Sequence, residues 1–355
     1  MYNFDDLTLA VASFGPNNKV IMDDLGLPSI MVGVPKMKYS DLITGGTQEV
    51  LPFWIVDGVE KDVIWVSKFA NIVKHDRAYS LPLEDPRASI NFDAALAACR
   101  KKGNGWHLNQ AGVFAALNLW SQKNGTVPHG NTNWGKSYTH PHESGITTYK
   151  DPAYDDGRGG RTATGSGPVT WYHDHSPAGI ADLCGNVWEW VSGMRLKDGE
   201  IHIIPYGNAM KSTCSMGADS TEWKAIKVDG SLVAPGTDGT LKIDMKTAGA
   251  TPMISTTIAN RSTDEQSPSV AFKDMEKASG ITTIPQLLVA LGLYPESSAT
   301  YGGDRFWARN NGERLPFRGS SFLYTSSGGP SALHLYYPRS NVSNDVGFRS
   351  AYVEL

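Results

Sequence analysis

Two short histidine runs are the residues of this chain best suited to metal or acid–base chemistry. His140 and His142 stand in the run HPHE. His173 and His175 flank Asp174 in the run WYHDHS. Neutral imidazole is a common metal ligand, and two imidazoles at this spacing could share an ion. Histidines in loops also hydrogen-bond neighbouring backbone, so both interpretations stay open.

The cysteines predict no thiol chemistry. Cys99, Cys184 and Cys214 are far apart in the sequence, and their number is odd. Such spacing matches neither a zinc motif nor a disulfide framework. We expect buried free thiols in a protein that folds in a reducing compartment.

Hydrophobic periodicity predicts the elements that would position these residues. Residues 50–73 alternate β-branched and aromatic side chains around an Asp-Gly turn, which predicts a strand pair. Asn91 is expected to cap a helix whose apolar residues recur at i, i+3, i+4 and i+7 and which closes at Gly103. A second helix is expected from near Asn109, and a strand at 188–191.

Two further segments flank and interrupt this pattern. Residues 1–48 carry short apolar runs broken by Gly and Pro, which predicts a structural arm or an oligomerisation element. Residues 121–170 are rich in Gly, Asn, Thr and His and predict long loops. Residues 195–300 are interpreted as an insertion. Within it we expect strands at 200–205, 223–228 and 240–245, and helices at 270–278 and 285–293.

Composition excludes several classes of protein. A net charge of −4 and a pI near 6.1 give no electrostatic basis for binding nucleic acid or an anionic membrane. No run of about eighteen apolar residues is present, so we expect no membrane insertion. The start MYNFDDLTLA lacks a basic region followed by an apolar one, so no secretory signal peptide is expected.

The order of motifs resembles the formylglycine-generating-enzyme and sulfatase-modifying-factor family. The order is a strand pair, a helix, WHLNQAGVFAALNLW, a long loop, GIADLCGNVWEW and RG…GFR, with GNVWEW the most specific signal. The resemblance covers roughly residues 50–195 and 305–355. It implies an α+β, C-type-lectin-like fold with two helices, a small antiparallel sheet and long irregular loops. The implied domains are an N-terminal arm at 1–48 and a lectin-like domain at 49–355.

The resemblance also implies a candidate calcium site, because some enzymes with this fold carry a structural Ca²⁺ beside the same block. Hard oxygen donors suit Ca²⁺. By position, the ligands would be the side chains of Asp182 and Glu189 and the carbonyls of Gly185 and Val187. The alternative is a carboxylate pair that only hydrogen-bonds loop backbone. Neither interpretation requires a cofactor.

The resemblance does not extend to the family's chemistry. Its oxygen-dependent enzymes bind copper with a cysteine pair near the C-terminal motif, and this chain has no cysteine after Cys214. Its iron-dependent relatives use His-x₃-His-x-Glu spacing, which neither histidine run has. We therefore expect no enzyme. An oxidative enzyme using His173 and His175 with Asp182 on iron is the alternative.

The ending resembles more closely the variable proteins of diversity-generating retroelements. In these systems a reverse transcriptase copies a template with errors at adenines into the 3′ end of a C-type-lectin gene. The varied codon is usually AAC or AAT, for Asn. Changes at its first two bases give Ser, Tyr, His, Asp, Leu or Phe, but never Lys, Glu, Trp or Met. None of these last four, nor Gln, occurs between Arg318 and Arg349.

The resemblance therefore implies a hypervariable ligand-binding region at about 318–349. Ten positions in it hold residues reachable from AAC: Ser321, Phe322, Leu323, Tyr324, Ser327, His334, Tyr336, Tyr337, Ser343 and Asp345. Exposed Tyr, His and Ser would form an adaptable binding surface, because Tyr gives large contact at low entropic cost. If HLYYP is extended, His334 and Tyr336 share one face, and Tyr337 lies on the other. The alternative is that Tyr336 and Tyr337 are core aromatics.

Fixed residues between these positions are expected to act as anchors. Arg318, Arg339 and Arg349 each offer five N–H donors that can tie irregular loops to carbonyls and carboxylates. Gly319 and Gly347 are expected to allow close packing of a buried strand.

The leading hypothesis is a ligand-binding display protein that recognises a macromolecule on a bacterial surface. Without a signal peptide, we expect a tail-associated receptor-binding protein of a phage virion, or otherwise a non-Sec bacterial or prophage protein. The arm at 1–48 would dock it or form a homotrimer. A Ca²⁺-dependent carbohydrate lectin is a further alternative, although the Glu-Pro-Asn and Gln-Pro-Asp motifs typical of such lectins are absent.

Overall fold

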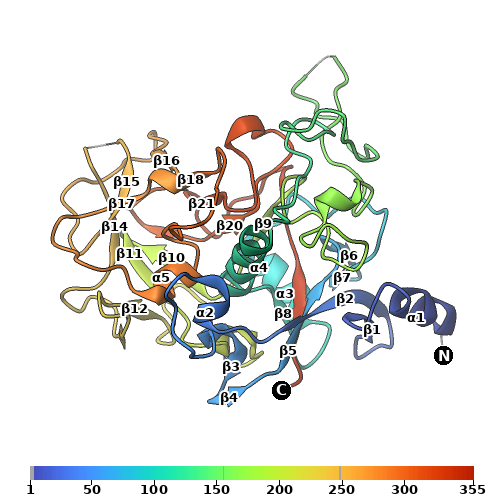
Figure 1. Ribbon diagram of the computed structural model, residues 1–355, viewed down its shortest axis with the longest axis horizontal. Coiled ribbons are helices and arrows are strands. Elements are labelled where there is room, and N and C mark those ends of the chain that lie inside the picture. Colours follow the sequence, from blue (N-terminus) through green and yellow to red (C-terminus); the bar gives the residue numbers. More distant parts are fainter. Residues whose placement is uncertain (1–3, 155, 248) are drawn as a thin grey trace.

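The computed structural model describes residues 4–154, 156–247 and 249–355. It is an α+β protein with few helices and three open sheets of five, eight and six strands. Figure 1 shows the eight-stranded sheet on the left, in yellow and orange, and the five-stranded sheet at the lower right. The expected single small antiparallel sheet is therefore wrong, because strands from the arm and the insertion build two of these sheets.

The five-stranded sheet joins the N-terminal segment to later parts of the chain. Its antiparallel order is β1 (Asn18–Met22), β2 (Pro28–Pro35), β5 (Val63–Ser67), β23 (Ser350–Tyr352) and β8 (Trp106–Leu108). Helix α1 (Asp5–Ala12) precedes β1, and Val11 packs against Val20 and Ile30. Within the described part of the predicted arm, residues 4–48, β2 hydrogen-bonds along β5 of the following segment.

The six-stranded sheet contains three short strands that overlap the segment predicted to vary. Its order is β16 (Ser269–Ala271), β18 (Arg305–Ala308), β21 (Leu333–Leu335), β20 (Phe317–Arg318), β9 (Trp188–Trp190) and β22 (Val346–Phe348). Two of its pairs are parallel, β18 with β21 and β9 with β22. In β9, both tryptophans pack in one apolar cluster while Glu189 reaches Arg349, which confirms the alternation predicted for GNVWEW.

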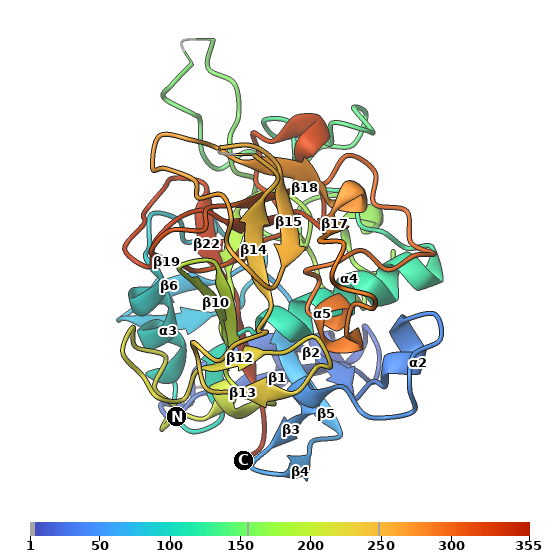
Figure 2. The same cartoon turned by 90° about the vertical axis from the view of Figure 1, so that its left-hand side faces the viewer.

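The insertion builds the eight-stranded sheet, which faces the viewer in Figure 2. Its main path is β13 (Leu232–Val233), β12 (Lys224–Ile226), β11 (Glu200–Ile203), β14 (Lys242–Met245), β15 (Pro252–Ser255) and β17 (Glu276–Lys277). Strand β10 (Met194–Lys197) joins it through β11, and β19 (Glu313–Arg314) pairs with β10. The three strands predicted in the insertion are confirmed.

One of the two helices predicted in the insertion is wrong. Residues 270–278 form the end of β16, a 3-10 turn and β17. Ala271, Met275 and Ala278 have the i, i+4, i+7 spacing of a helix, whereas Val270 and Phe272, two positions apart, have the period of a strand. The other helix is confirmed as α5 (Gln286–Ala290), which follows Pro285.

The helices and hairpins predicted near the start of the domain are confirmed. Helix α3 (Phe92–Arg100) is capped by Asn91, whose side chain accepts the Ala94 N–H at 2.9 Å. Helix α4 (Ala111–Asn124) ends at Gly125 with a φ of 67°. The predicted turn joins β3 (Ile55–Val56) to β4 (Val59–Glu60).

The remaining elements are short. They are helix α2 (Tyr39–Leu42), the strand pair β6 (Ile72–Lys74) and β7 (Arg77–Tyr79), and the 3-10 turns Pro52–Trp54, Val169–Trp171, Asn208–Met210, Phe272–Asp274 and Thr325–Ser327. Among the described residues between α4 and β9, one 3-10 turn and isolated bridges are the only regular structure, so the predicted long loops are confirmed. These loops project at the upper right of Figure 1. No helix in the described ranges is long and apolar enough to cross a bilayer.

Candidate functional site

Arg349 anchors the end of the predicted variable segment in the protein interior. Its Nη2 and Nε donate to the two carboxylate oxygens of Glu189 at 2.7 and 3.0 Å. Further bonds go to the backbone carbonyls of Ser67, Lys68 and Ala181. The Arg349 side chain is fully buried, so this ion pair fixes β9, β22 and the sheet containing β5 relative to one another.

The other two predicted anchors behave in the same way. Arg318 donates to the Leu291 carbonyl, and burial lowers the pKa of its guanidinium to about 9. Arg339 donates to the carboxylates of Glu313 and Asp93, both at 2.8 Å, and to the Met216 carbonyl at 2.9 Å. The predicted role of the three arginines is confirmed.

Two glycines allow the chain to pass close to neighbouring backbone. Gly319 has a φ of 87°, and a Cβ there would lie 2.7 Å from the Leu183 carbonyl oxygen. A Cβ at Gly347 would lie 2.6 Å from the Arg87 carbonyl oxygen. Contacts this short leave no room for a side chain, as predicted for a closely packed strand.

Between the anchors, aromatic rings from four strands and two loops meet in one place, which we call the aromatic cluster. It consists of Trp188, Trp307, Phe317, Tyr324, His334, Tyr336 and Tyr337. The Trp188 ring centroid lies 4.9 Å from that of Tyr324 and 5.6 Å from that of His334. The first three residues are fixed scaffold, and the last four belong to the predicted ligand-binding set.

His334 lies inside the cluster, which corrects the expectation that it is exposed. Its side chain stacks between Trp307 and Phe317, each at 5.3 Å between centroids. Only 4% of the residue is exposed, because β21 lies between β18 and β20 in the sheet. Burial lowers the imidazole pKa to about 3, so the ring is neutral at physiological pH.

The tyrosines of the cluster are partly exposed and form its outer part. Tyr336 and Tyr337 lie 4.8 Å apart and both contact His334. The predicted separation of the two tyrosines onto opposite faces is therefore wrong. Strand β21 ends at Leu335, and the strict alternation of an extended chain ends with it.

A carboxylate lies beside the tyrosines. Asp345 is buried and accepts the Ser321 hydroxyl at 2.8 Å and the Ser343 hydroxyl. Burial, and after it the charge of Asp345, raises the pKa of Tyr324 well above its usual value. Three more of the predicted residues, Ser321, Ser343 and Asp345, thus belong to the same region. Ser321 and Asp345 are buried beneath its surface.

Three predicted positions lie apart from the cluster. Phe322 is fully buried and packs on Tyr149, with ring centroids 6.3 Å apart, so it belongs to the core. Leu323 and Ser327 are partly exposed and flank Tyr324 along the chain. Of the ten positions, seven are therefore brought together.

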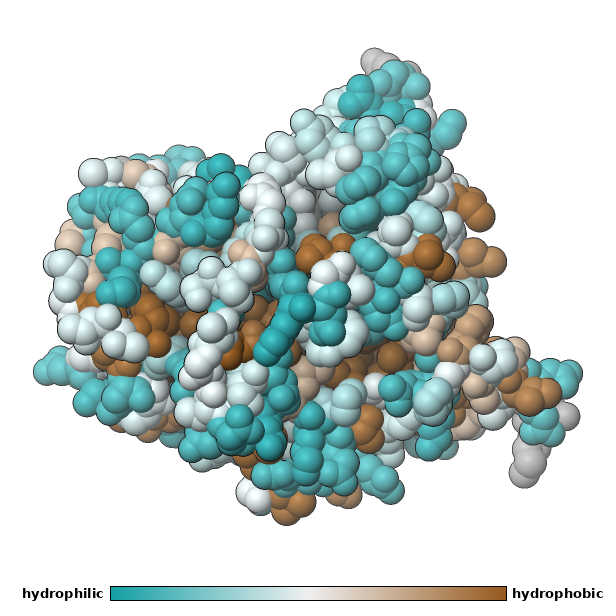
Figure 3. Space-filling model, in the orientation of Figure 1, coloured by the Kyte–Doolittle hydropathy of each residue, from teal (hydrophilic) through white to brown (hydrophobic). Residues whose placement is uncertain are grey.

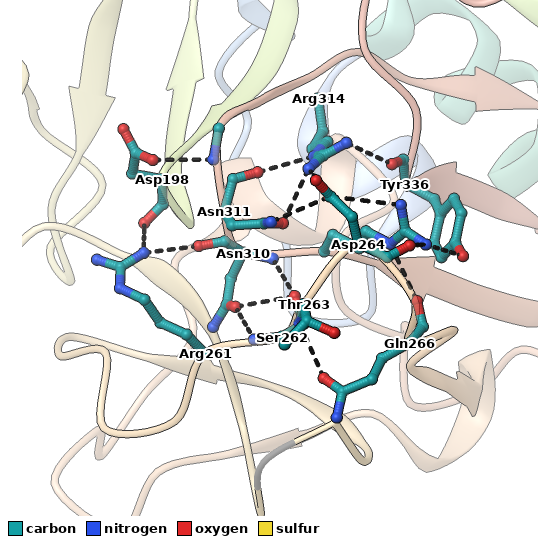
Figure 4. A network of polar contacts seen from close by, with 12 residues as sticks. Asp198, Arg261, Ser262, Thr263, Asp264, Gln266, Asn310, Asn311, Arg314 and Tyr336 are labelled. Atoms are coloured by element: carbon teal, nitrogen blue, oxygen red, sulfur yellow. Dashed lines mark hydrogen bonds and ion pairs between the residues drawn. The ribbon is translucent and has the colours of Figure 1, made fainter.

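The insertion borders this surface through residues 261–267, which sequence reasoning did not assign to the site. Figure 4 shows the polar network in which Asp264 and Arg314 hold Tyr336. The Arg314 Nη2 lies 2.8 Å from Asp264, and its Nη1 donates to the Tyr336 carbonyl at 3.1 Å. The Tyr336 hydroxyl bonds Ser267 at 2.9 Å, and the Arg309 guanidinium lies over its ring at 3.5 Å. No sequence motif marks this contact.

The set predicted to bind calcium does not fit that ion. Both oxygens of Glu189 already bond the Arg349 guanidinium, which balances the carboxylate charge. The Asp182 carboxylate accepts the Gly165 N–H at 2.8 Å, and burial raises its pKa to about 6. A Ca²⁺ ion would face an arginine that already occupies the cation position. The predicted set is Asp182, Gly185, Val187 and Glu189. The arrangement favours the alternative in which its two carboxylates, those of Asp182 and Glu189, bond only protein groups.

Calcium should therefore leave the thermal stability unchanged. We expect the same melting temperature in excess CaCl₂ and in EDTA, measured by differential scanning fluorimetry. An ion held at a hundredfold excess over its Kd would instead add about 2.7 kcal/mol to the free energy of unfolding. A rise in melting temperature that saturates with Ca²⁺ concentration would contradict the assignment.

The histidines of the WYHDHS run form hydrogen bonds with the backbone, which is one of the two interpretations that the sequence left open. His173 Nδ1 accepts the Ile180 N–H at 2.9 Å, and burial lowers its pKa to about 4. His175 Nε2 contacts the Val127 carbonyl at 3.1 Å. Within the described residues, the only group of three His, Cys, Asp or Glu side chains placed to share a metal ion is His129, His140 and Glu143. Of the two histidines singled out in the run HPHE, His140 belongs to this group and His142 does not; His129 and Glu143 were missed.

The three cysteines are buried and free, as predicted. Burial raises the pKa of the Cys214 thiol to about 11 and that of Cys99 and Cys184 further. Thiols in this state are poor nucleophiles and poor metal ligands at neutral pH.

One large cavity lies away from the aromatic cluster. Its volume is about 1230 Å³, and α2, α4 and α5 and strands β11 and β12 border it. Tyr39, Gln110 and Tyr206 are among its lining residues. None of the ten predicted ligand-binding residues lines it.

Comparison with known proteins gives only distant likenesses. No model of a protein family matches the chain, and no curated protein does. Among solved structures, Treponema denticola variable protein 1 is 11% identical with a TM-score of 0.34, over 96% of this chain and 100% of that one. The Major Tropism Determinant I1 variant is 12% identical with a TM-score of 0.33, over 95% and 71%. PvdO from Pseudomonas aeruginosa is 12% identical with a TM-score of 0.30, over 96% and 100%. TM-scores this low do not by themselves establish a shared fold.

Proposed function

We propose that this chain is a ligand-binding display protein whose segment 318–349 is diversified by adenine-directed mutagenic retrohoming. We further propose that it acts at a phage tail as a receptor-binding protein for a macromolecule on a bacterial surface. The observation that carries the proposal is that one segment contains both buried anchor residues and residues that form a surface. Buried anchors at Arg318 and Arg349 hold it, while residues reachable from Asn codons gather between them at one surface.

The chemistry of the surface suits adaptable binding. Tyr324, Tyr336 and Tyr337 offer partly exposed rings with hydroxyl groups; Tyr324 packs on Trp188 and Trp307, and Tyr337 packs on Phe317. Rings held in place lose little entropy on binding, and clustered aromatics are the usual centres of binding energy. Asp345 places a carboxylate beneath the rings, which favours ligands that present hydrogen-bond donors. Binding rather than catalysis is the function that this arrangement supports.

The N-terminal arm supports a docking or trimer-forming role. Leu9 is 74% exposed and Leu25 is 61% exposed, although the rest of the segment joins the core. Apolar atoms are visible at the right-hand end of the space-filling view, where α1 lies (Figure 3). Exposed leucines on a terminal helix and turn are candidates for contact with another subunit or with the tail.

Resequencing the gene tests the retroelement part of the proposal. We expect a near-copy of the 3′ end beside a reverse-transcriptase gene. In a growing population, variants should differ at the codons of the ten positions, while the codons of Arg318, Arg339 and Arg349 stay constant. The codons of 188–218 serve as the internal control. An even spread of substitutions over both regions, or the absence of a template repeat, would contradict diversification by a retroelement.

A further inference from the structure

The loop that contains HPHE folds into a tight turn that brings a carboxylate and an imidazole together. The backbone N–H of Glu143 donates to the His140 carbonyl at 2.9 Å, which closes the turn. His129, on the other arm of the same loop, stacks on His140 with ring centroids 3.6 Å apart and 10° between planes. Its Nδ1 lies 3.0 Å from both carboxylate oxygens of Glu143. Candidate ligand atoms from all three residues lie within 4.8 Å of one another.

The carboxylate of this group is held by a second layer of bonds. Glu143 is buried, and its Oε1 accepts the Thr170 hydroxyl at 2.9 Å. Its Oε2 accepts the indole N–H of the fully buried Trp171, also at 2.9 Å. Metal-binding carboxylates and imidazoles are commonly oriented by such outer partners, which are formed before the ion arrives.

His140 has no comparable structural role. It is partly exposed, and the only hydrogen bond of its side chain in the described structure is to its neighbour Thr139. Glu143 is already satisfied by His129, Thr170 and Trp171, so the protein alone does not require an imidazole over His129. A neutral imidazole is a common metal ligand.

We propose that His129, His140 and Glu143 form a binding site for one divalent transition-metal ion of the zinc class. Two nitrogens and one carboxylate oxygen are a common donor set for Zn²⁺, with a water molecule in the fourth position. Tetrahedral bonds of about 2.0–2.1 Å put ligand atoms about 3.3 Å apart. His129 and Glu143 are already near this spacing, so rotation of the partly exposed His140 side chain closes the site.

The ion would join two pieces of irregular chain, His129 and the turn 140–143, beside the proposed ligand-binding segment. His129, Thr132 and Thr139 line a cavity of about 320 Å³ that is also lined by residues 300–304 and by Ser326, Gly328, Gly329 and Pro330. Residues 125–168 have no helix or strand among those described, and isolated bridges and loop hydrogen bonds hold them. Binding of zinc would pin one wall of this cavity and hold the loop against the 3-10 turn Val169–Trp171.

Zinc binding to the whole chain tests the proposal, with ZnCl₂ as the probe. After dialysis against EDTA, isothermal titration is expected to give one site per chain. His140→Ala should weaken the affinity at least about tenfold, the loss typical even for an outer partner of a metal site. His142→Ala is the matched control. It removes the neighbouring, exposed imidazole of the same turn and should bind zinc like the original chain.

Two further readouts guard against misfolding and nonspecific binding. In EDTA, His140→Ala should melt at the same temperature as the original chain, and only the original chain should gain melting temperature with zinc. Co²⁺ bound at the site should give the strong visible absorption of tetrahedral coordination. The proposal is overturned if the original chain binds no stoichiometric zinc, or if both histidine variants bind like it. Equal loss in both variants would equally overturn this ligand set. None of these results depends on whether the segment 318–349 varies.

Discussion

Replacing Arg349 by methionine is expected to lower the free energy of unfolding by about 3–5 kcal/mol. The substitution leaves the carboxylate of Glu189 buried and without a counterion, and it leaves three backbone carbonyls without their donor. An unpaired buried charge costs far more than an exposed one, because the interior cannot solvate it. Urea unfolding followed by tryptophan fluorescence would measure the loss.

An exposed ion pair supplies the control for this prediction. Lys101 lies 2.9 Å from Asp76, with both side chains largely in solvent. Lys101→Ala should therefore change the stability by less than about 1 kcal/mol. The double variant Glu189→Gln with Arg349→Met should recover part of the loss, because the uncompensated charge is gone. If Arg349→Met is as stable as Lys101→Ala, the interior anchor does not exist.

Replacing His334 by phenylalanine is expected to make the protein more resistant to acid. The folded pKa of His334 is about 3, below the usual 6.5, so below pH 6.5 the unfolded chain binds a proton that the folded chain does not. The contribution to stability is complete above pH 6.5 and is lost as the pH falls toward 3. Between pH 7 and pH 4.5 the original chain should lose about 3 kcal/mol more than the variant, at 1.36 kcal/mol per pH unit.

Comparison of the original chain with His334→Phe isolates the effect of the His334 imidazole. Arg309, Tyr336 and Tyr337 surround the imidazole, and arginine and tyrosine side chains do not ordinarily titrate between pH 7 and 4.5. Other buried groups that do titrate there, such as His107 and Asp304, are present in both proteins and cancel. Parallel stability curves over this pH range would show that the His334 ring is not buried in the folded protein.

The local sequence pattern predicted helices and turns well wherever a capping or turn residue marks their ends. The Asn91 cap, the Gly125 terminus and the turn at Asp57 each depend on one or two residues and a short-range hydrogen bond. Periodicity does not say which strands pair. The pairing of β2 with β5, and of β21 between β18 and β20, joins residues far apart in the chain. This is why the size of the sheets was predicted wrongly.

The same limit explains what was missed at the site. The genetic code marked positions able to vary, but it carries no information on depth, and depth depends on the place of a strand in its sheet. His334 and Phe322 therefore proved to be interior residues. Residues 261–267 reach Tyr336 only through the folding of the insertion. His129 is eleven residues from His140 and joins it through a loop that has no regular period.

The position of β23 between β5 and β8 sets the order in which the molecule can be completed during synthesis. Four of the five strands in that sheet have left the ribosome long before Ser350–Tyr352, yet β5 and β8 meet only through this strand. In the nascent protein, one edge of β5 and one edge of β8 therefore stay unpaired until the segment 318–349 has been made. A frameshift within that segment also removes β22 and β23, and the chain cannot then close either sheet. A chain with such a frameshift is therefore expected to remain unfolded.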